Sequence, residues 1–181
     1  MLNIYHIEKS NYVNGHGNRF VLWLQGCDLG CQGCWNKETW SFEKNILKSI
    51  EEVFNEIQKS KNLDGVTFSG GEPFLQAGEL SKLAKKIKTY TNLSLQIFTG
   101  FELHELRDQN QKELLKYTDI LVAGRFDSTK KNNNQKVYIL NSNVPIWDFN
   151  NSDVEIEIDD NNHIKITGYP TSYLINELKG I

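Results

Sequence analysis

Hydrophobic residues follow two different spacings along the first two thirds of the chain. Short β-branched and aromatic runs predict strands at residues 19–26, 64–71, 92–100 and 119–124. Between them, apolar residues recur every three or four positions, which predicts helices at residues 45–61, 80–90 and 102–117, the last as one helix or two short ones. In the first helix, one face gathers Ile46, Leu47, Ile50, Val53, Phe54 and Ile57. This alternation predicts an α/β fold with a mostly parallel sheet and helices outside it.

The pattern changes after Gly124. Residues 127–135 are polar and rich in asparagine, so we expect a loop there. Short strands at 136–140, 154–159 and 163–170, a hairpin turn at 159–162 and a final helix at 171–180 are expected to follow. No stretch has the composition of an interdomain linker. We therefore expect a single domain over residues 1–181, with a core at about 1–140 and a short β-rich C-terminal extension at about 141–181.

The composition narrows the classes of partner. Of the 181 residues, 39% are hydrophobic and 24% are charged, which is typical of a soluble globular protein. The net charge of −3 argues against non-specific binding to nucleic acid or to an anionic membrane. No apolar run approaches the roughly 20 residues that span a bilayer, and the N-terminus does not resemble a signal peptide. We expect a cytoplasmic protein with neither nucleic acid nor membrane as a partner.

All three cysteines, Cys27, Cys31 and Cys34, fall within eight positions of the stretch "GCDLGCQGCWNKETW". An odd number of thiols in a reducing compartment favours metal or redox chemistry over a disulfide framework. A structural zinc site is one interpretation, but zinc usually takes four ligands. The fourth ligand would have to be one of the distant histidines His6, His16, His104 or His163. None of them stands at the spacing of a zinc finger.

An iron–sulfur cluster is the other interpretation of these thiols. Thiolates are the usual ligands of a cubane cluster, so three of them would bind three irons and leave the fourth iron free for another ligand. The spacing Cys-x3-Cys-x2-Cys follows directly after a predicted strand. Gly26, Gly30 and Gly33 would allow the backbone to wrap tightly around a cluster.

A second motif, "FSGGEPF", lies at the end of the second predicted strand and contains Ser69, Gly70, Gly71 and Glu72. Glycines at such a position let the backbone approach a ligand closely, and the carboxylate of Glu72 can bind an ammonium group. Taken alone, this sequence is equally typical of an ordinary turn.

Together, the cysteine loop and this turn resemble the radical S-adenosylmethionine enzymes. The resemblance implies a partial (β/α) barrel and a [4Fe–4S] cluster whose free iron binds the amino and carboxylate groups of S-adenosylmethionine. It also implies that one electron cleaves this cofactor to methionine and a 5′-deoxyadenosyl radical, which then abstracts a hydrogen atom. The Gly-Gly-Glu-Pro turn would contact the methionyl amino group.

Further motifs resemble the small activating enzymes of anaerobic ribonucleotide reductase, across about residues 3 to 140. These motifs are "NGHGNR", "WNKETW", "FTGF", "AGRFD" and the pair Asn134–Gln135. The resemblance implies a large glycyl-radical enzyme as the partner, with a glycine Cα–H as the substrate. It also implies an electron donor such as flavodoxin or ferredoxin. Because no cysteine remains for a second cluster or for hydrogen donation, simple hydrogen abstraction is the expected chemistry.

The chain departs from this pattern at several places. His16 replaces a proline, Ala123 replaces an acidic residue, and residues 131–133 replace an Arg-Gly-Ser sequence. Two alternatives therefore stay open. The chain is either a radical enzyme of the same core that modifies another protein, a peptide or a small molecule, or a non-catalytic iron–sulfur or zinc-binding module.

Several single residues are candidates for cofactor binding beside the two motifs. Trp35 would shield the cluster together with Trp40, although both are also typical core aromatics. Asn36 would bond the cofactor or the loop backbone. Thr99 and Gly100 end a strand on the side where ligands collect in parallel sheets. By resemblance, Arg125 would bind the carboxylate or ribose of S-adenosylmethionine, with a surface role as the alternative; Arg19 is a candidate for a partner or loop contact.

Overall fold

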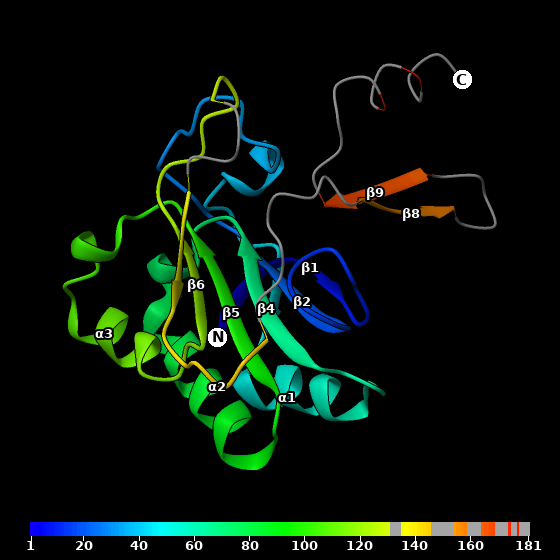
Figure 1. Cartoon of the computed structure of the whole chain (residues 1–181), viewed down its shortest axis with the longest axis vertical. Helices are drawn as coiled ribbons and strands as arrows, with labels where there is room; N and C mark the ends of the chain where they lie inside the picture. The colour runs from blue at the N-terminus through cyan, green and yellow to red at the C-terminus, as the bar shows by residue number, and fades with distance from the viewer. Residues whose placement is uncertain (131–134, 146–153, 159–163, 169–173, 175–176, 178–181) are drawn as a thin grey trace.

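The computed structural model describes residues 1–130, 135–145, 154–158, 164–168, 174 and 177. Its centre is a seven-stranded sheet in the order β3-β1-β2-β4-β5-β6-β7 (Figure 1). The four strands β2, β4, β5 and β6 are parallel to one another. At one edge β1 pairs antiparallel with β2 and β3 pairs antiparallel with β1, and at the other edge β7 pairs antiparallel with β6. The strands are Leu2–Glu8, Arg19–Leu24, Ile46–Lys48, Gly65–Gly70, Ser94–Thr99, Ile120–Ala123 and Lys136–Ile139. The prediction of an α/β fold with a mostly parallel central sheet is thus confirmed.

Three α-helices cover one face of this sheet (Figure 1). They are α1 (Ile50–Lys59), α2 (Ala77–Tyr90) and α3 (Gln109–Leu115), accompanied by the 3-10 turns η1 (Lys37–Thr39), η2 (Pro73–Gln76) and η3 (Leu103–Glu105). Capping boxes begin α1 at Ser49 and α3 at Asp108, where side chain and backbone satisfy the first free amides reciprocally. The third predicted helical region is therefore two short elements, η3 and α3.

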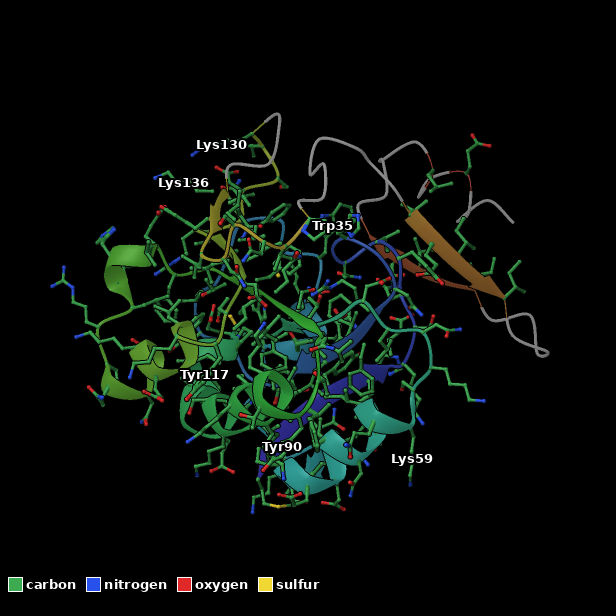
Figure 2. The ribbon with its side chains drawn as sticks, turned by 60° about the horizontal axis from the view of Figure 1, so that its bottom comes forward. Trp35, Lys59, Tyr90, Tyr117, Lys130 and Lys136 are labelled. Atoms are coloured by element: carbon green, nitrogen blue, oxygen red, sulfur yellow. The ribbon has the colours of Figure 1, made fainter. Side chains whose placement is uncertain are left out.

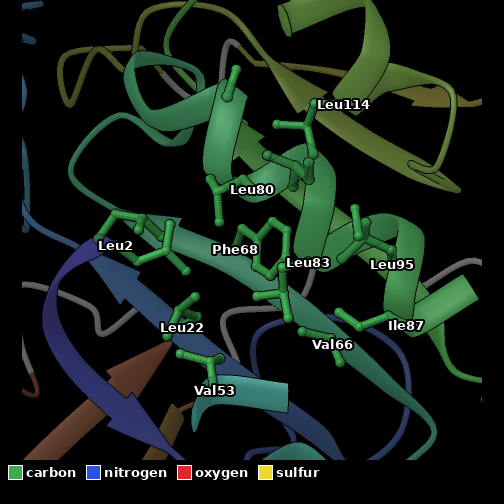
Figure 3. Close-up of a cluster of buried hydrophobic side chains, with 14 of the residues drawn as sticks. Leu2, Leu22, Val53, Val66, Phe68, Leu80, Leu83, Ile87, Leu95 and Leu114 are labelled. Carbon is green, nitrogen blue, oxygen red and sulfur yellow. The ribbon is translucent and has the colours of Figure 1, made fainter. Parts of the chain in front are cut away.

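Alternation along the parallel strands divides the sheet into two chemically different faces. Phe20, Leu22, Val66, Phe68 and Leu95 belong to the apolar cluster beneath the helices, as Figure 3 shows for several of them. The intervening positions include buried polar side chains, Arg19, Thr67 and Gln96, besides apolar ones such as Val21. Because the helices cover one face, a ligand site can form only on the opposite face or at the carboxyl ends of the parallel strands.

The prediction for residues 45–61 was wrong at its start. Ile46–Lys48 forms β3 and pairs with β1, and the helix begins only at Ile50. Ile46 and Leu47 are each 41% exposed, so they do not extend the buried face of α1. The capping box of Ser49 with Glu52 fixes the helix start, and the short apolar run before it carries no clear period. The strand β1 itself was not predicted.

The C-terminal extension contains an antiparallel hairpin of β8 (Val154–Ile158) and β9 (Ile164–Gly168). These strands and β7 confirm the three predicted there. The predicted turn at 159–162, part of the loop at 127–135 and most of the final helix lie outside the described residues. Within the described ranges, no helix is both long and apolar enough to span a membrane.

Candidate functional site

A pocket opens at the carboxyl ends of β2, β4 and β5, where ligands collect in parallel sheets. Its walls include nearly all the residues singled out in the sequence: Cys27, Cys31, Cys34, Trp35, Asn36, Ser69, Gly70, Gly71, Glu72 and Thr99. Figure 2 shows Trp35 at the end of the molecule opposite Tyr90, the last residue of α2. The fold thus brings together two motifs that lie more than thirty positions apart in the sequence.

The cysteine loop is fixed at its base by the chain that follows it. The amide of Gly26 donates to the carbonyl of Thr39 at 2.7 Å, and the amide of Cys27 donates to the carbonyl of Trp40 at 3.2 Å. Within the loop, Gly30 and Gly33 have φ angles of +61° and +71°, which side chains disfavour. The loop therefore closes on itself, and its three cysteines line the pocket.

A segment after β6 crosses this loop. The amide of Ser128 donates to the carbonyl of Gln32 at 3.1 Å, and Asp127 forms a parallel bridge with Gln32. A Cβ added at Gly33 would lie 1.9 Å from the Ser128 hydroxyl oxygen, so only glycine fits under the crossing segment. The two segments thereby fix the part of the loop between Cys31 and Cys34.

The three thiols are half-buried and line one pocket. In the part of the chain that the structure describes, no three Cys, His, Asp or Glu side chains converge as a single metal ion would require. A cubane cluster demands something different, because each thiolate binds its own iron and the thiols must surround the cluster. The donor set of three neighbouring thiols in an open pocket fits such a cluster.

The protonation of Cys27 responds to its surroundings. Burial raises the pKa of the Cys27 thiol to about 11, a backbone hydrogen bond at Leu29 opposes the rise, and the nearby Glu72 carboxylate adds to it. A thiol must lose its proton to bind iron. Loading this site therefore displaces protons.

The Gly-Gly-Glu-Pro turn packs directly against the start of the cysteine loop. The amide of Gly71 donates to the carbonyl of Leu24 at 2.8 Å, and the amide of Glu72 donates to the carbonyl of Gly26 at 2.9 Å. A Cβ at Gly71 would lie only 2.4 Å from the Gly26 carbonyl oxygen. The expectation was a close approach to a ligand, and the structure adds a close approach to the chain's own backbone.

Glu72 is buried, with 1% of its surface exposed, and joins two strand ends. Its Oε1 accepts from the Phe74 amide at 2.9 Å and the Thr99 hydroxyl at 2.8 Å, and its Oε2 accepts from the Gly100 amide at 2.9 Å. Burial raises the pKa of Glu72 to about 7, while these hydrogen bonds and the charge of Arg125 act in the opposite direction. A carboxylate has about four acceptor positions, so one remains for a ligand.

The two candidate arginines, Arg125 and Arg19, do not line the pocket. Arg125 is not part of the pocket lining: its guanidinium bonds the carbonyl of Gly100, lies 3.0 Å from Glu105 Oε2 and stacks 5.2 Å from the ring of Phe101. Arg19 is 1% exposed and makes loop and strand contacts, with Nε donating to Thr67 Oγ1 at 2.6 Å and Nη1 donating to the His16 carbonyl at 3.1 Å. Burial lowers the pKa of Arg19 to about 10.

The sequence did not single out several residues of the lining. These are Asn14, Trp23, Leu29, Phe98, Phe126 and Gly168, whereas Gly100 was expected beside Thr99 at the strand end and Gln135 belongs to a recognised pair. Gln135 Nε2 donates to the Gly124 carbonyl at 2.9 Å and the Thr99 carbonyl at 3.3 Å, so it joins the ends of β5 and β6. Asn14, Phe98 and Phe126 stand inside recognised motifs, which could have identified them. Gly168 comes from the hairpin, and no local sequence signal places it here.

Comparisons with known proteins agree with this geometry. Residues 13–146 match the family model of the 4Fe-4S single cluster domain. The chain is 30% identical over 132 residues to the anaerobic ribonucleoside-triphosphate reductase-activating protein of Haemophilus influenzae, covering 69% of this chain and 84% of that protein. The protein of the same name from Enterobacteria phage T4 is 28% identical over 152 residues, or 81% of this chain and 94% of that protein.

A larger enzyme matches over a shorter region. The pyruvate formate-lyase-activating enzyme of Listeria monocytogenes is 37% identical over 98 residues, which is 50% of this chain and 40% of that enzyme. The matched family model spans the cysteine loop, and the relatives are activating enzymes that imply a [4Fe–4S] cluster and S-adenosylmethionine. The chain therefore belongs to the 4Fe-4S single cluster family, among the radical S-adenosylmethionine activating proteins, and its cofactors are a [4Fe–4S] cluster and S-adenosylmethionine.

Proposed function

We propose that this chain installs a glycyl radical on a large partner enzyme, and that the partner is an anaerobic ribonucleoside-triphosphate reductase. The observation that carries the proposal is the meeting of three thiols and the Glu72 turn in one pocket at the parallel strand ends. The similarity over 84% and 94% of two reductase-activating proteins supports this partner.

With a cluster bound, the site supplies one electron to S-adenosylmethionine, whose cleavage gives methionine and the radical that takes a hydrogen atom from the substrate glycine. Cys27, Cys31 and Cys34 would hold that cluster. Trp35 and Phe98 contribute aromatic surface to the pocket, which limits access of water to the reacting atoms. Glu72, fixed by its three hydrogen bonds, would bind the methionyl ammonium through its remaining acceptor position.

Three finer points belong to the same proposal. The parallel strands β2, β4, β5 and β6, with a site at their carboxyl ends, support a partial (β/α) barrel. A small one-electron carrier of the flavodoxin or ferredoxin kind would reduce the cluster. The three free cysteines support work in a reducing cytoplasm.

An anaerobic assay tests the proposal. The full chain is reconstituted with iron and sulfide, mixed with dithionite, S-adenosylmethionine and the reductase, and examined for 5′-deoxyadenosine by chromatography. Electron paramagnetic resonance on the same sample detects a glycyl radical. We expect both products together. 5′-Deoxyadenosine without a radical on the reductase would point to another substrate, and a reducible cluster that yields neither product would point to a non-catalytic module.

A further inference from the structure

A second cavity of about 560 Å³ lies beside the pocket, between β1, the cysteine loop and β9. We name it the hairpin groove, and its walls include Tyr5, His6, Trp35, Ile166, Thr167 and Gly168. Its volume falls in the range of about 300–1,000 Å³ that is usual for ligand sites. Trp35 and Gly168 line both the groove and the pocket. The groove therefore adjoins the cluster site.

One wall of the groove is an irregular part of β1. Ile4 pairs with Leu24 and His6 pairs with Trp23, so two steps along β1 match one step along β2 and Tyr5 is the extra residue. Such bulges change the direction of side chains and occur often beside active sites. Here the bulge lies where Tyr5 and His6 line the groove.

The opposite wall is the strand β9. Among the described strands, β9 pairs only with β8, so its second edge has no strand partner there. A strand edge of this kind can take up an extended peptide through backbone hydrogen bonds. The described lining holds one carboxylate, that of Glu38, and no lysine or arginine. This chemistry suits an extended segment with little charge.

The hairpin is held in place by specific contacts with the loop before β2. Asn11 Nδ2 donates to Glu155 Oε2 at 2.9 Å and to Thr167 Oγ1 at 3.2 Å. Asn11 is fully buried, and its Oδ1 accepts from Asn14 Nδ2 at 2.9 Å. Asn14 in turn lines the cluster pocket. The hairpin is thus bonded to the wall of the pocket and forms a fixed side of the groove.

We propose that the hairpin groove binds the segment of the substrate protein that carries the target glycine, as an extended strand beside β9. The proposal rests on the proposed function. A glycine has no side chain, so recognition must come from the flanking backbone and neighbouring side chains. The edge of β9 would bond that backbone, and the aromatic side chains of Tyr5 and Trp35 would pack against the neighbours.

Two matched variants of the hairpin test the proposal by affinity. Ile166→Asp places a charge in the groove, whereas Ile158→Asp places the same charge on the same hairpin at a side chain that is 65% exposed and not part of the lining. The probe is the purified anaerobic ribonucleoside-triphosphate reductase, titrated with cluster-loaded protein. We expect Ile166→Asp to raise the Kd by about tenfold or more and Ile158→Asp to change it by less than about twofold. Equal effects would overturn the groove.

Photocrosslinking gives a second measurement that does not depend on a destabilising charge. p-Benzoylphenylalanine replaces Ile166 in one variant and Ile158 in the other, and crosslinked peptides are identified by mass spectrometry. We expect crosslinks from position 166 to the reductase segment around its radical glycine. Crosslinks to a second copy of this chain, or to a distant surface of the reductase, would overturn the assignment.

The outcomes separate the two proposals. If the wild-type chain produces no glycyl radical on the reductase, the proposed function fails, and the groove assignment fails with it. If the radical forms but both positions bind and crosslink alike, the groove assignment fails alone while the function stands.

Discussion

At the scale of single residues, Glu72 shows how one buried side chain can connect two motifs. Its carboxylate accepts hydrogen bonds from its own turn, at Phe74, and from the end of β5, at Thr99 and Gly100. All three partners donate hydrogen bonds, so both carboxylate oxygens of Glu72 must act as acceptors. A residue that would bind a cofactor ammonium therefore also holds the pocket together.

The substitution Glu72→Gln tests this double role. The amide keeps the shape of the side chain, but its NH₂ group would face a backbone or hydroxyl donor in a buried position. We expect the free energy of unfolding to fall by about 1–3 kcal/mol in urea denaturation. We also expect weaker binding of S-adenosylmethionine to the cluster-loaded protein.

Glu43→Gln provides the control, because Glu43 is exposed. Its unfolding free energy should stay within about 0.5 kcal/mol of the wild-type value. Similar stabilities and affinities for both variants would remove Glu72 from its proposed role.

At the scale of elements, the cysteine loop and the Gly-Gly-Glu-Pro turn act as one unit. The turn bonds Leu24 and Gly26 at the base of the loop, while Thr39 and Trp40 bond the same base from the other side. The position of the thiols is therefore set by backbone contacts as well as by the loop sequence.

Alanine replacement of Cys27, Cys31 or Cys34 tests the ligand assignment. Each change removes one thiolate, and we expect each to abolish an intact four-iron cluster and the formation of 5′-deoxyadenosine. Iron content and visible absorption after anaerobic reconstitution measure the cluster. Gln32→Ala is the matched control, because this exposed loop residue contacts Ser128 through its backbone carbonyl. A complete cluster in any cysteine variant would refute the assignment.

Replacement by alanine is expected to have opposite effects on stability at two glycines, Gly71 and Gly78. A Cβ at Gly71 would lie 2.4 Å from a backbone oxygen, whereas at Gly78 it would meet Asn110 at an ordinary 3.5 Å. We expect Gly71→Ala to destabilise the protein by about 1–3 kcal/mol, as overpacking does. Gly78→Ala, in α2, should stabilise it by about 0.5–1 kcal/mol. Thermal unfolding distinguishes the two, and a stable Gly71→Ala protein would contradict the close packing.

The sequence predicted those elements whose signals are local. The parallel strands, α2 and the two site motifs all carry their patterns within short windows. The strand β3 was missed because its identity depends on pairing with β1, more than forty residues away. For Arg125 the sequence left both a cofactor role and a surface role open, because the choice between the pocket and Glu105 depends on η3, which comes from another part of the chain.

At the scale of the whole molecule, the hairpin of β8 and β9 extends the site beyond the central sheet. Its contacts with Asn11 and the amide of Tyr12 rest largely on one carboxylate, that of Glu155. Long-range contacts of this kind leave no trace in a local window, which is why Gly168 was absent from the predicted site.

Glu155→Ala tests whether this carboxylate holds the hairpin. Loss of its hydrogen bonds should raise the rate of hydrogen–deuterium exchange at the amides of β8 and β9, because local opening becomes easier. The amides of α2, which belong to the central core, serve as the internal control and should exchange at an unchanged rate. Identical exchange in the hairpin of both proteins would show that other contacts hold it.

The location of the apolar core bears on what happens to the protein when oxygen destroys its cluster. None of the three cysteines belongs to that core, which lies between the sheet and the helices. The base of the cysteine loop is held by backbone bonds that require no iron. We therefore expect a cluster destroyed by air to leave behind an intact scaffold. Repair would then need only fresh iron, sulfide and reductant, and a cell returning to anaerobic life could restore the old molecules without synthesising new ones.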